Sequence, residues 1–178
     1  LEEVLLALKS LDTVEAVALG GSRSTGASEE NSDYDIYVYC SEIPTGKTRE
    51  NLLGKYCSIA EFGNHYWESE DNTVMNNGIP VDIIYREVDR FGRYIDTVIK
   101  GGKAFNGYTT AFWHNIKNSK VLFDKTGTFT KFRDMAQIDF PENLRSAIIK
   151  NNRNLLNGKL PSYDRQVKKA QERGDIVS

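Results

Sequence analysis

Three aspartates and a glycine-rich segment are the residues whose types and spacing could do chemistry in this sequence. Asp33 and Asp35 lie two positions apart, so on a β-strand their side chains point to one face while Tyr34 points to the other. Two carboxylates on one face repel each other, and burying them without a compensating charge is costly. A divalent cation removes the repulsion, and oxygen-only ligands suit Mg²⁺ bound together with substrate phosphates. An exposed strand edge without a metal is the alternative.

A third carboxylate, Asp82, stands inside the apolar segment 80–85, where a charged side chain needs a partner. If this segment forms a strand beside the strand of Asp35, all three carboxylates could reach the same metal pair. A structural aspartate is the alternative for Asp82.

The glycine-rich segment 17–26 ends an apolar run in Gly20 and Gly21. Ser22 is placed to cap a short helical turn that Gly26 ends. Backbone N–H groups at such a turn favour phosphate binding, and a Cβ at the glycines would hold the phosphate away. A plain turn is the alternative. A Walker A loop is excluded, because Ala27 stands where the phosphate-binding lysine must be.

Hydrophobic periodicity predicts the elements that must position these groups. An Asn76–Gly78 hairpin turn precedes the strand of Asp82. The fold class is α/β (α+β), with a mixed β-sheet flanked by helices. We expect one domain over 1–136, followed over 137–178 by the start of a helical C-terminal region that is cut short. Strands are expected at 14–19, 33–40, 58–62, 65–69, 73–75, 79–85 and 120–123, and helices at 2–11, 48–56, 88–98, 109–117, 129–136, 142–157 and 162–173.

Composition excludes several classes of protein. Hydrophobic residues make up 39% of the 178 residues, which is enough for a core and argues against a disordered chain. No apolar stretch approaches the roughly 20 residues of a membrane-spanning helix. Cys40 and Cys57 form no C-x-x-C pair and there are only two histidines, which disfavours a zinc site or a disulfide scaffold. With no signal segment and no initial Met, a trimmed cytoplasmic protein is expected.

The net charge of −2 is unevenly distributed along the chain. Residues 1–99 hold 8 Lys and Arg against 18 Asp and Glu, whereas residues 100–178 hold 15 against 7. Two solvated faces explain this, and so does a cleft in which acidic groups hold cations and basic groups hold an anion.

Taken in order, Gly21-Ser22, then Asp33-x-Asp35, then a later apolar strand with a single Asp82, resembles the nucleotidyltransferase superfamily typified by DNA polymerase beta. The compact Gly-Ser-Arg-Ser-Thr-Gly motif followed by Ser-Asp-Tyr-Asp is similar to the bacterial branch of aminoglycoside and lincosamide nucleotidyltransferases. The resemblance covers about residues 14–86 and implies a polymerase-beta-like fold.

The resemblance also implies roles for individual residues. Asp33 and Asp35 would bind two Mg²⁺ ions, and Asp82 would complete the shell of the catalytic metal as ligand, general base or both. Gly21 and Ser22 would hold the β- and γ-phosphates of an NTP, expected to be ATP. Arg23 would be a charged helper to them.

The implied function is Mg²⁺-dependent transfer of a nucleoside monophosphate from an NTP to a hydroxyl of a small-molecule acceptor. An enzyme that modifies a protein or an RNA end, and a nucleotidyltransferase-fold antitoxin or regulatory module, are the alternatives. Residues 141–178 are only mildly basic, with 8 Lys and Arg against 4 Asp and Glu, so nucleic-acid binding is not favoured. Neither the acceptor nor the oligomeric state follows from the sequence.

Other residues have weaker claims to the site. The acidic residues Glu61, Glu68 and Glu70 are expected at the rim or on the acceptor side. The aromatic residues Trp67, Phe112 and Trp113 could stack on a base but fit a core as well. Lys103 and Lys120 are candidates to face the triphosphate, and His114 is expected to be structural.

Overall fold

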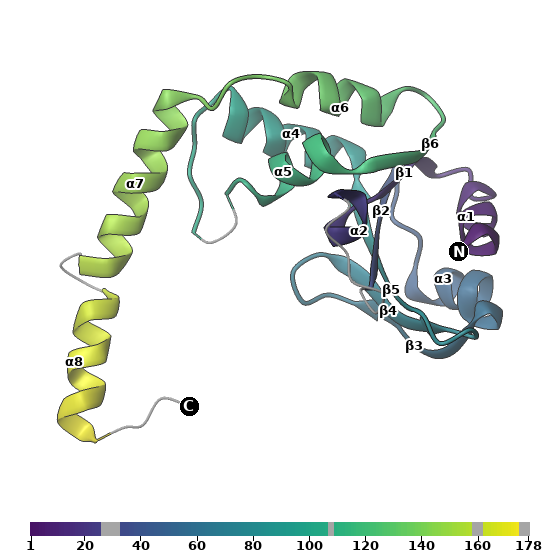
Figure 1. Cartoon of the computed structure of the whole chain (residues 1–178), viewed down its shortest axis with the longest axis horizontal. Helices are drawn as coiled ribbons and strands as arrows, with labels where there is room; N and C mark the ends of the chain where they lie inside the picture. Colours follow the sequence, from purple (N-terminus) through teal and green to yellow (C-terminus); the bar gives the residue numbers. More distant parts are fainter. Residues whose placement is uncertain (26–32, 107–108, 158–161, 175–178) are drawn as a thin grey trace. The chain divides into compact units, whose positions relative to one another are not determined.

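The framework of the chain is one six-stranded mixed β-sheet (Figure 1). The computed structural model describes residues 1–25, 33–106, 109–157 and 162–174, without the side chains of Ser22 and Thr25. The strands lie in the order β3-β4-β5-β2-β1-β6, and only the β2–β5 pair is parallel. Their bounds are β1 (Val14–Leu19), β2 (Tyr34–Cys40), β3 (Cys57–Asn64), β4 (Ser69–Met75), β5 (Pro80–Glu87) and β6 (Lys120–Asp124).

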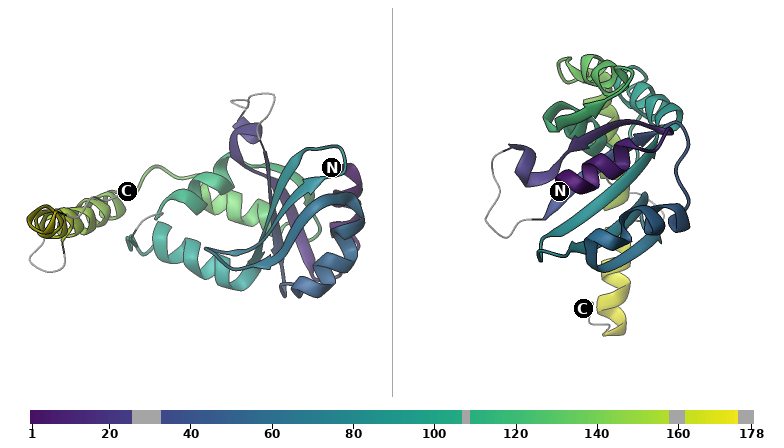
Figure 2. Two further views of the ribbon diagram at one scale, coloured as in Figure 1. Left: turned by 90° about the horizontal axis from the view of Figure 1, so that it is seen from below. Right: turned by 90° about the vertical axis from the view of Figure 1, so that its right-hand side faces the viewer.

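Helices α1 (Glu2–Lys9) and α3 (Gly46–Leu53) cover one face of the sheet (Figures 1 and 2). In α1, Val4 and Leu8 lie four residues apart and are buried, because this spacing puts both on one side of a helix. They pack with Leu53 of α3 against the strands. The strands contribute alternate residues to this core, among them Val17, Leu19, Ile36, Val38, Val81 and Ile83.

The opposite face of β1 and β2 packs against α4 (Val88–Ile99) and α6 (Thr128–Ala136). The ring of Tyr39 makes edge contacts with Phe91 and Phe129, each at a centroid distance of 5.3 Å. The carboxylate of Asp124, at the end of β6, accepts hydrogen bonds from the backbone N–H groups of Phe129 and Thr130 and so begins α6. Helix α5 (Ala111–Asn118) precedes β6, and the short helix α2 (Gly21–Thr25) follows β1 beside β2.

The described residues form two compact units. The first contains 1–95 and 113–137 and holds the whole sheet; the second contains 96–112 and 138–178. Within the second unit lie α7 (Glu142–Asn157) and α8 (Tyr163–Arg173), and Asn151 of α7 donates a 2.8 Å hydrogen bond to Asn106. Among the described residues, no helix has the length and apolar character needed to cross a bilayer.

The expected mixed sheet flanked by helices is confirmed, and most differences concern element ends. The three short strands expected over 58–75 are two longer ones, β3 and β4, and the strand expected at 65–69 is wrong except for Ser69. Helix α1 ends at Lys9, and the helix expected at 48–56 is α3 followed by a 3₁₀ turn over Gly54–Tyr56. The structure makes Ser22 the second residue of α2 and not its cap. Gly26 lies outside the described residues.

Candidate active site

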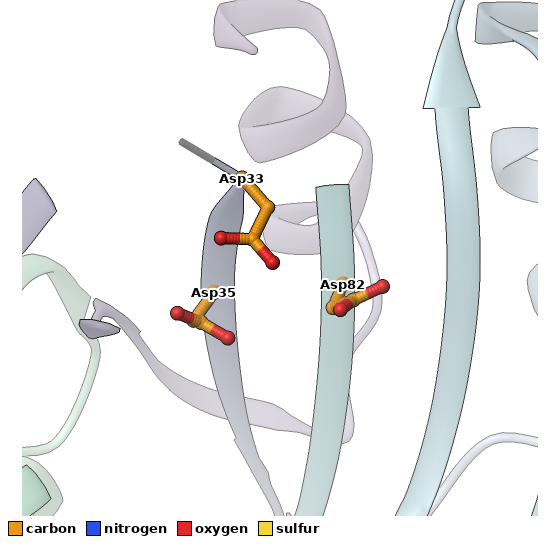
Figure 3. A group of neighbouring side chains, drawn as sticks. All are labelled: Asp33, Asp35 and Asp82. Carbon is orange, nitrogen blue, oxygen red and sulfur yellow. The ribbon is translucent and has the colours of Figure 1, made fainter. Parts of the chain in front are cut away.

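The three aspartates come together because β2 and β5 are neighbouring parallel strands (Figure 3). Asp35 of β2 pairs directly with Asp82 of β5, so the two side chains leave the sheet on the same face. Asp33 precedes β2 by one residue and shares that face. One carboxylate oxygen from each residue lies within 4.8 Å of the others. The predicted convergence of the three carboxylates is confirmed; their binding of metal stays a prediction.

The electrostatics of the cluster favour a cation. The pKa of Asp35 is raised above its usual value of 3.8, first by burial and then by the charges of Asp33 and Asp82. Over the part of the chain that the structure describes, no lysine or arginine forms an ion pair with any of the three aspartates. Mg²⁺ takes oxygen ligands at about 2.1 Å, so oxygens that bind one ion lie at most about 4.2 Å apart. The separation of up to 4.8 Å between the carboxylate oxygens is close to this limit, and carboxylates are ligands that Mg²⁺ prefers. The donor set fits divalent cations.

The glycine-rich segment lies against the same face. The N–H of Gly20 donates a 2.8 Å hydrogen bond to the backbone oxygen of Asp35, which extends the pairing of β1 with β2. Gly21 has a positive φ of 63°, and a Cβ at this position would overlap the carboxylate of Asp35. A Cβ at Gly20 would overlap the ring of Tyr37. The glycines are therefore required by their close approach to β2, whether or not a phosphate binds beside them.

The structure says less about Ser22 and Arg23, the other two residues expected to bind the nucleotide. The side chain of Ser22 lies outside the described part of the structure. Arg23 stacks its guanidinium on the ring of Tyr34, 4.1 Å from the centroid. Tyr34 alternates with Asp35 along β2 and therefore lies on the other face of the strand. A contact of Arg23 with a nucleotide stays a prediction.

Two contacts beside the carboxylates were not predicted from the sequence. Asn72 of β4 donates a 3.0 Å hydrogen bond from Nδ2 to Oδ1 of Asp82. Arg86, four residues after Asp82 on β5, binds Glu68 through two hydrogen bonds of 2.7 and 2.8 Å. Arg86 is only 3% exposed and also donates to the hydroxyl of Tyr39. Both contacts depend on the register of β4 against β5, and the Asn76–Gly78 hairpin turn is the sequence signal that could have indicated this register.

The other candidate residues from the sequence differ in burial and surroundings in the structure. Trp113 is buried and its Nε1 donates to the backbone oxygen of Ala136, so it belongs to the core. Trp67 is 85% exposed. Burial and the charges of Asp82 and Glu68 raise the pKa of Glu70, which lies near the cluster. The side chains of Glu61, Lys103, His114 and Lys120 are exposed, and Phe112 is partly buried.

Three comparisons relate this chain to known proteins. A comparison with curated protein sequences finds no match. A solved structure described as "Crystal structure of the toxin-antitoxin with AMP-PNP" is similar over 97% of this chain and 97% of that chain, at 14% identity and a TM-score of 0.43. The nucleotidyltransferase domain family matches residues 1–105, a range that includes Gly21 and all three aspartates. This chain belongs to the nucleotidyltransferase domain family.

Proposed function

We propose that this protein transfers a nucleoside monophosphate from an NTP to a hydroxyl group of a small-molecule acceptor, with release of pyrophosphate. The observation that carries the proposal is the cluster of Asp33, Asp35 and Asp82 within 4.8 Å, in a nucleotidyltransferase domain. Two Mg²⁺ ions would be held by these residues, Asp33 and Asp35 binding both and Asp82 completing the shell of one.

The chemistry required of the protein is charge control and positioning. When bound, the Mg²⁺ ions would neutralise the triphosphate and lower the pKa of the attacking hydroxyl. The acceptor oxygen forms a bond to the α-phosphorus, the bond to pyrophosphate breaks, and the hydroxyl proton is released. Asp82 lies between Asp35 and the β4 side chains, where a carboxylate oxygen can receive that proton.

The glycine-rich segment completes the nucleotide side of the proposal. Gly20 and Gly21 follow β1 and lie against Asp35, so a triphosphate bound there would be beside the carboxylates. In the proposal, backbone N–H groups of Gly21 and Ser22 bind the β- and γ-phosphates, with ATP as the expected nucleotide.

The test is titration of the full chain with each Mg²⁺–NTP by calorimetry, followed by incubation with acceptor panels. Small hydroxyl compounds, RNA and protein acceptors are compared by pyrophosphate release and by mass spectrometry of the acceptor. We expect nucleotide addition to a small compound, abolished in Asp35→Asn. Addition only to RNA or protein would overturn the acceptor class, and absence of Mg²⁺–NTP binding would overturn the proposal.

A further inference from the structure

A row of polar residues crosses four neighbouring strands on the face of the carboxylate cluster. The register pairs Glu61 with Asn72, Asn72 with Asp82, and Asp82 with Asp35. Directly paired residues on adjacent strands put their Cβ atoms about 4.5–5.5 Å apart on one face. The row therefore joins the acidic cluster to the edge strand β3.

Hydrogen bonds run along this row. Nδ2 of Asn72 donates to Oδ1 of Asp82 at 3.0 Å. Oδ1 of Asn72 accepts from Nδ2 of Asn64 at 2.8 Å, and the same Nδ2 group donates to Oε2 of Glu61 at 3.3 Å. Both polar ends of the Asn72 amide thus have partners, and the side chain is held between β3 and β5.

The chemistry at the two ends fixes which way each amide faces. An ionised carboxylate only accepts hydrogen bonds, so Asn64 must present its NH₂ group toward Glu61. The same NH₂ group then faces the oxygen of Asn72, which leaves the NH₂ group of Asn72 for Asp82. The orientation of the Asn72 amide is therefore fixed from both sides, by Asp82 on β5 and by Asn64 on β3.

We propose that Asn72 is a positioning residue: it holds Oδ1 of Asp82 and thereby orients Oδ2 toward a divalent cation shared with Asp35 and Asp33. The inference rests on the proposed function, since it assigns a role toward the metal pair named there. Partners of this kind fix the orientation of ligating side chains, and their loss typically lowers metal affinity or activity about 10- to 100-fold.

An amide suits this position better than a charged side chain would. A lysine at residue 72 would neutralise Asp82 and compete with the cation. A fourth carboxylate would add to the like charge that, after burial, already raises the pKa of Asp35. Asparagine donates one hydrogen bond and leaves the charge of Asp82 unchanged.

The test measures Mn²⁺ binding to the full chain by electron paramagnetic resonance, a readout that needs no acceptor. For Asn72→Ala we expect the dissociation constant for Mn²⁺ to rise about 10-fold. Asn76→Ala is the matched control, because Asn76 lies after the same strand and donates to the backbone oxygen of Lys55 instead. The control should keep the affinity of the wild type. Where turnover is measurable, kcat should fall in Asn72→Ala while the KM of the acceptor stays unchanged.

A double-mutant cycle separates positioning from a general effect on the fold. Asp82→Asn removes the ligand, so adding Asn72→Ala to it should not weaken Mn²⁺ binding further. Additive losses would mean that Asn72 acts independently of Asp82 and would overturn the inference. If Asn72→Ala fails to fold, Asn64→Ala is the second test. This variant keeps the Asn72 donor to Asp82 but removes the Asn64 amide that orients it. The dissociation constant for Mn²⁺ should then rise, by a smaller factor than the roughly 10-fold expected for Asn72→Ala.

The outcomes distinguish this inference from the proposed function. Wild-type protein that binds Mn²⁺, with Asn72→Ala binding equally well, overturns the role of Asn72 and leaves the proposed function standing. Wild-type protein that binds no Mn²⁺ overturns the inference, and it overturns the proposed function as well if Mg²⁺–NTP also fails to bind.

Discussion

Among the three aspartates of the cluster, burial and like charge together raise the pKa of Asp35. Both causes disfavour its ionised form and raise its pKa in the folded protein above 3.8. A raised folded-state pKa adds stability below the unfolded pKa, and that stability is lost as the pH rises through the folded pKa. Without a divalent cation, ionised Asp35 therefore opposes folding, and its charge is explained by function better than by stability.

Asp35→Asn should separate these two effects. We expect transfer activity to fall about 100-fold or more, because the amide lacks the charge that holds the cation. In metal-free buffer the melting temperature should match or exceed that of the wild type, and the difference should grow from about pH 3.8 upward. Thermal unfolding over a pH series with chelator measures this, with the exposed Asp139→Asn as a charge control. A large loss of stability at every pH would indicate a structural aspartate instead.

Addition of Mg²⁺ provides a second prediction at this scale. A ligand that binds only the folded state at 100 times its dissociation constant stabilises it by about 2.7 kcal/mol. We expect Mg²⁺ to raise the melting temperature of the wild type and to leave Asp35→Asn nearly unchanged. Equal shifts in both proteins would place the bound cation away from the cluster.

At the scale of the elements, the turn from β1 into α2 can lie close to β2 because Gly21 has no side chain. Gly21 combines a positive φ with contact to Asp35, whereas Gly78 in the β4–β5 turn has a φ of 82° and open space around it. The two glycines share one backbone requirement and differ in their surroundings, so they form a matched pair.

Gly21→Ala and Gly78→Ala should therefore behave differently. Both lose about 1 kcal/mol or more of stability from the strained backbone. Only Gly21→Ala should also weaken Mn²⁺ and Mg²⁺–NTP binding, because its Cβ displaces the carboxylate of Asp35. Calorimetric titration of both variants checks this. Wild-type affinities in Gly21→Ala would mean that the glycine serves only as a turn.

An ion pair between Glu68, just before β4, and Arg86 of β5 connects these two neighbouring strands. Arg86 is buried beside the rings of Tyr37 and Phe91, so removal of Glu68 takes away the carboxylate that binds this buried charge. We expect Glu68→Ala to destabilise the fold by about 3 kcal/mol, measured by urea unfolding. A second replacement, Arg86→Met, should recover part of that loss. A stable Glu68→Ala protein with a raised KM for the acceptor would support the acceptor-side role expected from the sequence instead.

How much of this site the sequence could predict depends on whether a contact is local. The two-residue spacing of Asp33 and Asp35 and the apolar surroundings of Asp82 are local, and they identified both strands. Asn72 has no such signal, because a polar residue on an alternating strand is typical of an exposed face. Its contact exists because a hairpin pairs it with Asp82. Loop length fixes the register of a hairpin, so the Asn76–Gly78 turn is the signal that could have placed Asn72 opposite Asp82. The wrong strand at 65–69 has a related cause, since β3 continues to Asn64 through a register shift.

On the scale of the whole molecule, the candidate site belongs to a single compact unit. The sheet, the three aspartates, Gly21 and Asn72 all lie within 1–95 and 113–137. Residues 96–112 are grouped with α7 and α8, where Asn106 accepts its hydrogen bond from Asn151. The connection between α4 and α5 is thus packed with the helices that follow residue 137. The domain boundary expected near residue 136 stays a prediction. It implies that the chain before this boundary folds and binds the cation without the helices that follow.

A chain ending at residue 137 tests that prediction. All groups proposed to bind the cation remain in it, so we expect cooperative thermal unfolding and a Mn²⁺ dissociation constant equal to that of the full chain. Stability should fall, because residues 96–112 lose their packing against α7, including the Asn106 contact. Transfer to the acceptor is measured in parallel, because it requires every part of the site whereas Mn²⁺ binding reports on the carboxylate cluster alone. Mn²⁺ binding, calorimetric unfolding and product formation are compared in the two chains. Loss of Mn²⁺ binding with cooperative unfolding retained would mean that the helical segment supports the carboxylate cluster itself, and the two units would then act as one domain.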